Sequence, residues 1–282
     1  MSELFNRDGV YGKLNFDTDI NNWDVSNVTN MLSMFANASA FNQGLNNWDV
    51  SLVENMQNMF YNAFAFDQDL NSWDVGLVEN MKNMFYNANS FNRSLNSWNV
   101  SNVKNFVGMF NDADVFNQPL DNWVLSTQLT NLNYMFLEAS RFNQPLDNWV
   151  TTNITQLRGT FKGADDFNQN LDTWDVSEVI LMDELFSGAT SFNGNIDNWQ
   201  VQKVTHLSQT FRDATNFARD ISGWQTLKLK YLNQTFRKAV SFNTDINSWD
   251  VEEVVNMNNM FNGASIFNQP LDQWKTYKVN TL

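Results

Sequence analysis

Aspartate recurs in this chain at a regular spacing that could support metal binding. Asp24, Asp49 and Asp74 are 25 residues apart, and Asp175 and Asp250 fall on the same position later. If successive segments stack at about 4.8 Å, the first three carboxylates lie close enough to attract a hard cation such as Ca²⁺. The alternative is an acidic face that is solvated and screened by salt. Three equivalent exposed carboxylates lack the pKa asymmetry that glycoside hydrolysis needs, so we do not expect that chemistry.

Other reactive residue types are scarce. The chain has one histidine, His206, and no cysteine, so a histidine-based catalytic site or a thiolate metal site would lack partners. We expect His206 to be a satisfied surface residue. No glycine-rich phosphate loop and no nucleophile–base pair is present. The sequence therefore predicts a protein that is not an enzyme and needs no cofactor.

The net charge of −14 bears on the partners of the protein. An acidic surface disfavours nucleic acid and anionic lipid, because both attract basic surfaces. No stretch approaches about 18 consecutive apolar residues, so we expect no membrane insertion. The first eight residues lack the features of a secretory signal, which leaves the compartment undetermined. Basic residues gather late, and they form either a solvated face or a contact patch for an acidic partner: Arg212, Arg219, Lys228, Lys230, Arg237 and Lys238.

Tryptophan marks the period that organises the whole chain. All 11 Trp residues are separated by 25 residues, except for one interval of 26 between Trp123 and Trp149. A fixed period of this length is typical of a solenoid. The Trp residues are Trp23, Trp48, Trp73, Trp98, Trp123, Trp149, Trp174, Trp199, Trp224, Trp249 and Trp274.

The apolar pattern within one repeat predicts a strand followed by a helix. Trp48 and Val50 flank Asp49, which suits a short strand with Asp49 outward. The apolar residues from Val53 to Ala63 then follow at intervals of three, four and three, which is typical of one face of a helix. Ser51 precedes this segment and could cap the helix.

Repetition of this unit predicts an α/β fold. We expect a leucine-rich-repeat-like curved solenoid of about 11 turns, with a parallel sheet on the concave side and short helices on the convex side. Residues 1–15 are interpreted as an N-terminal cap and residues 16–282 as one solenoid. The last turn is incomplete at Leu282, which indicates a fragment of a longer array or end-to-end contact with another chain.

Two kinds of repeated position have an expected structural role. The Trp column, the Met-Phe pairs such as Met59-Phe60, and the second Phe of each repeat should form the core. Asn recurs after the second Phe, as at Asn42 and Asn92, and in a second column of Asn30, Asn55, Asn80, Asn105, Asn131 and Asn256. These residues should form a ladder of side-chain amides that satisfies backbone groups from turn to turn. The alternative for this ladder is a role in ligand binding.

Particular segments resemble a known family. Met109-Phe110, Ala113, Phe116-Asn117-Gln118-Pro119-Leu120 and Trp123 resemble the repeat of the BspA-like bacterial surface proteins, including the mycoplasma- and Listeria-type repeats. Phe267–Trp274 and Trp48–Ser51 match as well, and the resemblance extends over roughly residues 16–282. It implies a leucine-rich-repeat-like solenoid with an adhesion-type binding role at a cell surface or virion. It implies no catalytic residues.

Outward residues of the predicted strands are the candidate ligand contacts. Because many turns share them, we expect an extended protein or glycan ligand rather than a small molecule. The alternative is a structural spacer or lattice component joined through the solenoid ends. The candidate residues are Asn47, Asp49, Ser72, Asp74, Ser97, Asn99, Asn122, Asn148, Val150, Thr173, Asp175, Asn198 and Gln200.

Overall fold

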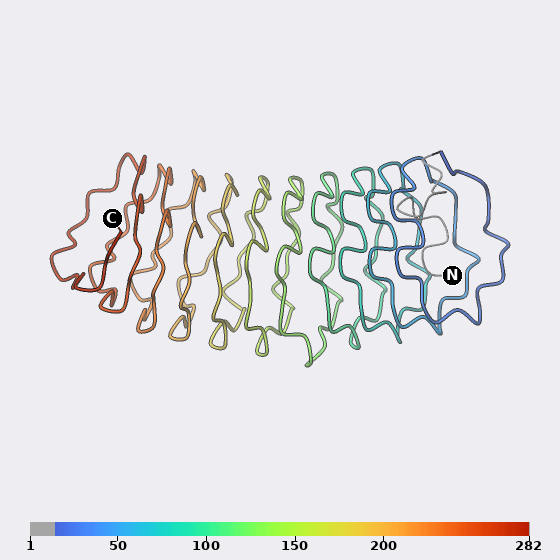
Figure 1. Ribbon diagram of the computed structural model, residues 1–282, viewed down its shortest axis with the longest axis horizontal. Helices are drawn as coiled ribbons and strands as arrows, with labels where there is room; N and C mark the ends of the chain where they lie inside the picture. Colours follow the sequence, from blue (N-terminus) through green and yellow to red (C-terminus); the bar gives the residue numbers. More distant parts are fainter. Residues whose placement is uncertain (1–14, 282) are drawn as a thin grey trace.

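The computed structural model describes residues 15–281. Figure 1 shows an elongated row of coils that follow one another along the chain, with the coils at both ends turned toward the viewer. We number the coils 1 to 11 by the aliphatic residue three positions before each Trp. They begin at Ile20, Leu45, Leu70, Leu95, Leu120, Leu146, Leu171, Ile196, Ile221, Ile246 and Leu271.

The predicted α/β architecture is wrong in its secondary structure. Residues 15–281 contain no helix and no extended strand. In place of a sheet, nine isolated parallel bridges join single residues of successive coils in this range, beginning with Asn30–Asn55 and ending with Asn256–Thr281. The solenoid therefore has neither a concave parallel sheet nor convex helices, although the repeat itself is present. The predicted cap at residues 1–15 lies almost wholly outside the described residues.

The segment predicted as a helix is a series of overlapping β-turns. The amides of Met56, Asn58, Phe60 and Asn62 donate to carbonyls of the next coil. The amides of the alternate residues donate to the carbonyl three residues earlier in the same coil, as Ala63 N donates to Phe60 O at 3.1 Å. An α-helix would direct every amide to the carbonyl four residues earlier. Apolar residues that are three and four positions apart are therefore buried on the same side of the chain, although the chain is not helical there.

Left-handed residues make these turns possible. Asn58 and Asn62 have φ of 55° and 56° and occupy the third position of their turns, as in a type II turn. Asn, Asp and Gly tolerate this conformation best. They dominate the second left-handed column, which holds Asn37, Asn62, Asn87, Asp112, Gly163, Gly188, Asp213 and Gly263. A helix has no place for a positive φ, so these residues exclude it.

Stacked aromatic rings form the core, as predicted. Phe60 lies 4.0 Å from Phe66 in its own coil and 5.5 Å from Phe85 in the next, measured between ring centroids. The same two Phe columns continue through the stack. Trp73 Nε1 donates to Leu45 O at 3.0 Å, so each indole is bonded to the preceding coil. The Trp residues from Trp48 to Trp249 are at most 4% exposed, which confirms the predicted interior column.

The extra residue of the 26-residue repeat interrupts the bridges. Within the described part of the chain, bridges join Asn80 to Asn105 and Asn131 to Gln156, and none joins Asn105 to Asn131. Phe106 stands here where most coils have Met or Leu, and it stacks on Trp123 at 5.4 Å. The aromatic core therefore continues across the interruption. In Figure 1 the green loop of this repeat projects furthest along the lower edge.

The predicted asparagine ladder is confirmed for the column after the second Phe, whereas the side-chain oxygen of each Asn in the second column accepts within its own coil, as Asn55 Oδ1 accepts from Gln57 N at 3.0 Å. The side-chain oxygen of Asn92 accepts from Asn117 N at 3.0 Å, and that of Asn143 accepts from Asn168 N at 2.9 Å. Asn193 accepts in the same way from Ala218 N. These bonds fix the spacing of the coils at a corner where no bridge operates.

Ala218 interrupts this ladder because alanine offers no acceptor to the amide of Asn243. Ala218→Asn is expected to stabilise the protein by about 0.5–1.5 kcal/mol, the net value of one added hydrogen bond. Urea unfolding measures it. The matched variant Asn193→Ala removes an acceptor from the same column and should destabilise by a similar amount. Equal stability of all three proteins would contradict a stabilising role for the ladder.

Candidate binding surface

All twelve candidate residues of the binding-site prediction, and Val150, are exposed. They occupy two positions of each coil, before and after Trp, so they line one edge of the stack. Several are used in coil-to-coil bonds: Thr173 Oγ1 donates to Asp147 O at 2.9 Å and Asn198 Nδ2 to Asp172 O at 3.0 Å. The Ser97 hydroxyl likewise donates to Asn71. The structure brings the predicted residues together on one edge. Thr173, Asn198 and Ser97 also form hydrogen bonds to the preceding coil.

The predicted helix caps are turns around aspartate. Ser51 donates both its amide, at 3.0 Å, and its hydroxyl, at 2.6 Å, to Asp49 Oδ1. Ser26 does the same to Asp24. These hydrogen bonds, first that of the serine hydroxyl and then that of its amide, lower the pKa of both aspartates. Ser51 therefore closes an Asx turn and caps no helix.

The calcium hypothesis for Asp24, Asp49 and Asp74 finds no support in the coordinates. One carboxylate oxygen of each accepts from its own turn, as Asp74 Oδ1 does from Gly76 N at 3.0 Å. Among residues 15–281 no group of three or more acidic, His or Cys side chains could hold a metal ion.

No segment between residues 15 and 281 forms a helix with the length and apolar character that a membrane span requires.

A second surface lies along the parallel bridges. We call it the bridge face, and it consists of the side chains at each bridge residue and at the residue two positions later. The residue between them is buried, as Met182 is between Leu181 and Asp183. In coils 5 to 9 the face contains Asn131, Asn133, Gln156, Arg158, Leu181, Asp183, His206, Ser208, Tyr231 and Asn233.

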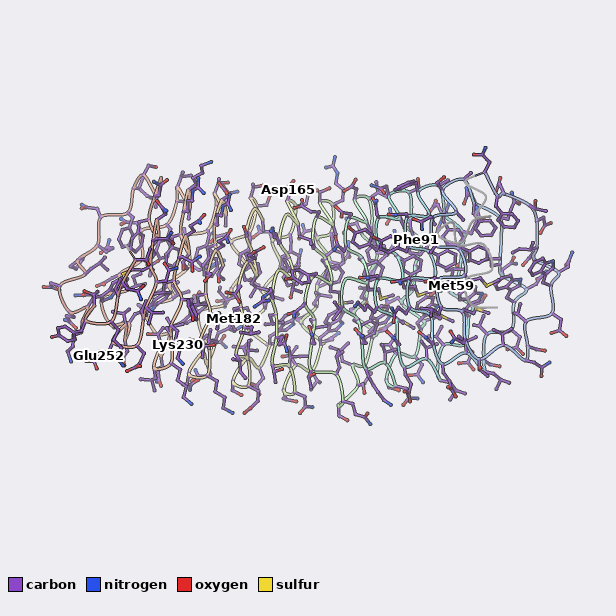
Figure 2. All side chains as sticks on the ribbon, viewed as in Figure 1. Met59, Phe91, Asp165, Met182, Lys230 and Glu252 are labelled. Carbon is purple, nitrogen blue, oxygen red and sulfur yellow. The ribbon has the colours of Figure 1, made fainter. Side chains whose placement is uncertain are left out.

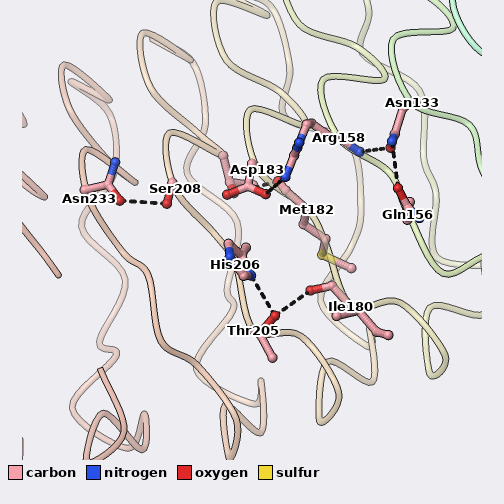
Figure 3. Close-up of polar contacts among 11 residues, drawn as sticks. Asn133, Gln156, Arg158, Ile180, Met182, Asp183, Thr205, His206, Ser208 and Asn233 are labelled. Atoms are coloured by element: carbon pink, nitrogen blue, oxygen red, sulfur yellow. Dashed lines mark hydrogen bonds and ion pairs between the residues drawn. The ribbon is translucent and has the colours of Figure 1, made fainter. Parts of the chain in front are cut away.

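Polar contacts link the bridge face from coil to coil (Figure 3). Arg158 approaches the buried Asp183 at 3.3 Å, and Ser208 Oγ donates to Asn233 Oδ1 at 2.7 Å. Asn133 Nδ2 donates to Gln156 Oε1 at 2.9 Å. Asn133 and Asp183 are buried and the other four side chains are half-buried. All six are held in place by these contacts, which reduces the entropy that a bound ligand would have to remove.

His206 lies within this face. Its Nδ1 is 2.7 Å from the Thr205 hydroxyl, and its ring centroid is 4.5 Å from that of Tyr231. Burial lowers the pKa of His206, with Arg158 and Lys230 acting in the same direction and Asp183 opposing them. The predicted satisfied histidine is thus confirmed. Sequence reasoning missed the bridge face because it placed this column on a helix.

The late basic residues do not form one patch. Arg212 bonds to Asp213 and Gln209, and Lys238 lies 3.7 Å from Asp213. Arg219 donates to the Asn193 carbonyl on a different corner of the coil. Lys228 and Lys230 follow Trp224 by four and six residues, and Figure 2 labels Lys230 in the lower half of the view. A single contact patch of six cations is therefore wrong.

The carboxylates of Asp112 and Glu138, in the second left-handed column, have raised pKa values. Partial burial, and then the charge of Asp114, raise the pKa of Asp112 above 3.8. Burial, Asp112 and Asp165 raise that of Glu138. Asp112 follows Asn62 and Asn87 in its column, where Asn87 Nδ2 donates to Asn62 Oδ1 at 2.9 Å. A carboxylate at this position cannot donate the next bond.

Asp112→Asn is expected to stabilise the protein at pH 7 by on the order of 1 kcal/mol, because the amide can continue the column. Between pH 3.8 and the raised pKa, the folded state binds more protons at Asp112 than the unfolded chain does. The cost of this carboxylate is therefore full above the raised pKa and disappears as the pH falls toward 3.8. Thermal unfolding of both proteins from pH 7 to pH 4 should show the difference shrinking. A difference that is constant with pH would contradict this account.

Comparison with known proteins identifies the repeat. The family model described as "Mycoplasma protein of unknown function, DUF285" matches residues 1–93, 67–159, 130–232 and 182–282. No curated protein matches the chain. A solved structure described as the crystal structure of the TLR13–ssRNA13 complex is 12% identical, with a TM-score of 0.27. That match covers 82% of this chain and 41% of the other, so this chain spans about two fifths of it. At this TM-score nothing about that complex carries over.

Proposed function

The chain belongs to the mycoplasma repeat family DUF285, and we propose that it is a non-enzymatic scaffold that binds an extended protein or glycan ligand along an exposed face of its coils. The mycoplasma part of the predicted resemblance is confirmed, whereas the BspA-like and Listeria-type surface role remains a proposal. An adhesion function at a cell surface agrees with that resemblance. The absence of a second histidine and of cysteine supports the non-enzymatic part.

The observation that carries the proposal is a difference between the faces of the coil. The edge around Trp repeats Asn, Asp and Ser or Thr, whose side chains bond to the neighbouring coil, as Thr173 and Asn198 do, or close a turn of their own coil, as Asp49 does. In coils 1 to 5 and 10 the bridge residue is Asn, whose side chain closes a turn as that of Asn55 does, and in coils 6 to 9 it varies from Gln156 through Leu181 and His206 to Tyr231. The contacts between coils do not require one residue type at these varied positions, so their side chains are available to recognise a ligand. We therefore assign binding to the bridge face, with the predicted edge residues as the competing surface.

An array of immobilised glycans and polysaccharides, probed with the labelled intact chain, tests the proposal. Binding to an extended glycan should be lost in Tyr231→Ala and in His206→Ala and kept in Asn122→Ala and Asn198→Ala, with melting temperatures checked for all four. Loss in the Asn variants alone would place the site on the predicted edge. If the chain binds no glycan, and none of the extracellular proteins presented in parallel, the scaffold proposal is wrong.

A further inference from the structure

One edge of the solenoid is built from the same turn in every coil except coil 5, where the extra residue moves the turn to Ser126–Leu129. Val53 N donates to Val50 O at 2.9 Å, and both valines are buried, so the residues around them point outward. We call this the turn edge, and in coil 2 it consists of Asp49, Ser51, Leu52 and Glu54. It runs along the lower side of Figures 1 and 2, where Figure 2 labels Lys230 and Glu252.

Charge on the turn edge changes sign along the stack. Coil 2 has Asp49 and Glu54 around Leu52, which is 46% exposed. Coil 3 repeats this arrangement with Asp74 and Glu79 around a similarly exposed Leu77. Coils 8 and 9 have cations on the same edge: Lys203 and Lys228 occupy the position of Leu52, and Lys230 occupies that of Glu54, beside the exposed Leu227.

The middle of the turn edge is uncharged and apolar. Val124 in coil 5 and Val150 in coil 6 occupy the position that holds Asp49 in coil 2. They are 68% and 65% exposed, which makes them the most exposed aliphatic residues of the described chain. On either side of them, Lys104 lies in coil 4, and Asp175 and Glu178 lie in coil 7.

These positions are related by a reversal of the coil order. Coil 2 is complementary to coil 9, coil 3 to coil 8 and coil 4 to coil 7, and Val124 of coil 5 corresponds to Val150 of coil 6. The centre of the reversal lies between coils 5 and 6. A two-fold axis at this point, perpendicular to the stack, would bring acidic coils 2, 3 and 7 of one chain against basic coils 9, 8 and 4 of a second chain. Coil 10 would lie opposite coil 1 with its Asp24, and Glu252 and Glu253 of coil 10 are already paired within the chain, with Lys275 and Lys278.

We propose that the turn edge is the interface of an antiparallel two-fold dimer of this chain. Glu54 of each copy faces Lys228 and Lys230 of the other, and Leu52 covers Leu227. Val124 of one chain packs against Val150 of the other on both sides of the axis. A second copy of the chain accounts for the reversal of the charges between coils 2 and 9, and for the placement of Leu52 opposite Leu227 and of Val124 opposite Val150.

Intramolecular ion pairs identify the groups that carry the interface. Glu79 pairs with Lys104 at 2.7 Å and Glu178 with Lys203 at 2.5 Å within one chain. Neither Glu54 nor Lys228 has an ion-pair partner among residues 15–281. Their charges are therefore available to a second copy, and Glu54→Lys and Lys228→Glu test the contact without breaking a pair within the chain.

Light scattering after size exclusion, and sedimentation over a range of concentrations, should find a dimer of the intact chain that dissociates as salt is raised. Glu54→Lys alone and Lys228→Glu alone should each raise the dimer dissociation constant by about tenfold or more, because each variant places like charges in contact at both ends. The two single variants should form a heterodimer when they are mixed, since both of its end contacts then pair opposite charges. The double variant should again form a homodimer, because both contacts carry the original charges in exchanged positions.

The absence of native cysteine allows an independent test at the axis. Val124→Cys and Val150→Cys chains, mixed and oxidised, should give a disulfide-linked heterodimer. Leu95→Cys and Leu171→Cys, at positions that are fully buried, serve as matched controls and should not cross-link. A chain that remains monomeric at all concentrations would overturn the proposal. So would assembly that grows open-ended or that is unaffected by both charge reversals.

Discussion

Phe161→Ala is expected to lower the free energy of unfolding by about 3–5 kcal/mol, the range for deleting a buried aromatic ring. The Phe161 side chain is fully buried, and its ring centroid lies 4.0 Å from that of Phe167. It also stacks on Phe136 at 5.6 Å and on Phe186 at 5.7 Å in the neighbouring coils. Because each coil is stabilised mainly by its neighbours, the cavity weakens the stack on both sides.

Denaturant unfolding followed by circular dichroism and by tryptophan fluorescence measures this effect. Phe64→Ala is the matched control, because Phe64 is 43% exposed and lies outside the two stacked columns. Its effect should stay within about 0.5 kcal/mol, as for most surface substitutions. Equal losses at the two positions would show that the Phe columns do not provide the core of the solenoid.

Gly194→Ala should be at least as damaging, for a different reason. A Cβ at this position would lie 1.9 Å from the carbonyl oxygen of Gln169 and 2.7 Å from its carbon. Nearby, Leu171 N donates to Asn195 O at 2.9 Å, which joins the first residue of coil 7 to its last. Main-chain atoms cannot move aside as a flexible side chain can, so the coils must separate. We expect a loss of more than about 3 kcal/mol, the upper end of the overpacking range.

Gly223→Ala provides the comparison, because nothing lies within 4 Å of its added methyl group and its φ is not positive. It should leave stability unchanged or raise it slightly by restricting the unfolded chain. Both variants are measured by the same denaturant titration. If Gly194→Ala unfolds at the same denaturant concentration as Gly223→Ala, the close approach of coils 6 and 7 at Gln169 is wrong.

The core was predictable because burial leaves a direct trace in sequence. Trp48, Phe60 and Phe66 recur at one period, and only a stack of equivalent coils buries every copy in the same way. The ladder at Asn92 was predictable for the same reason, since a polar side chain repeated at a turn must satisfy its neighbours. The position of the extra residue, between Val124 and Leu129, was also readable from the spacing alone.

The helix between Val53 and Ala63 was predicted wrongly because apolar spacing reports which side chains are buried and not how the backbone turns. A chain of β-turns and a helix both bury residues three and four apart. Left-handed Asn62, and Gly163 and Gly188 in the same column, contained the missing signal. Read together, they indicate positive φ in each coil, which no helix accommodates.

The candidate surfaces depend more on the tertiary structure. The sequence by itself determined the period, the buried columns and the outward edge of Asn47 and Asp49, because these follow from which residues repeat. Only the stacked coils decided that Leu181, His206 and Tyr231 lie side by side on a bridge face. The physical reason is that the direction of each amide, to its own coil or to the next, is set by contacts between coils, and that direction determines which side chains face solvent together.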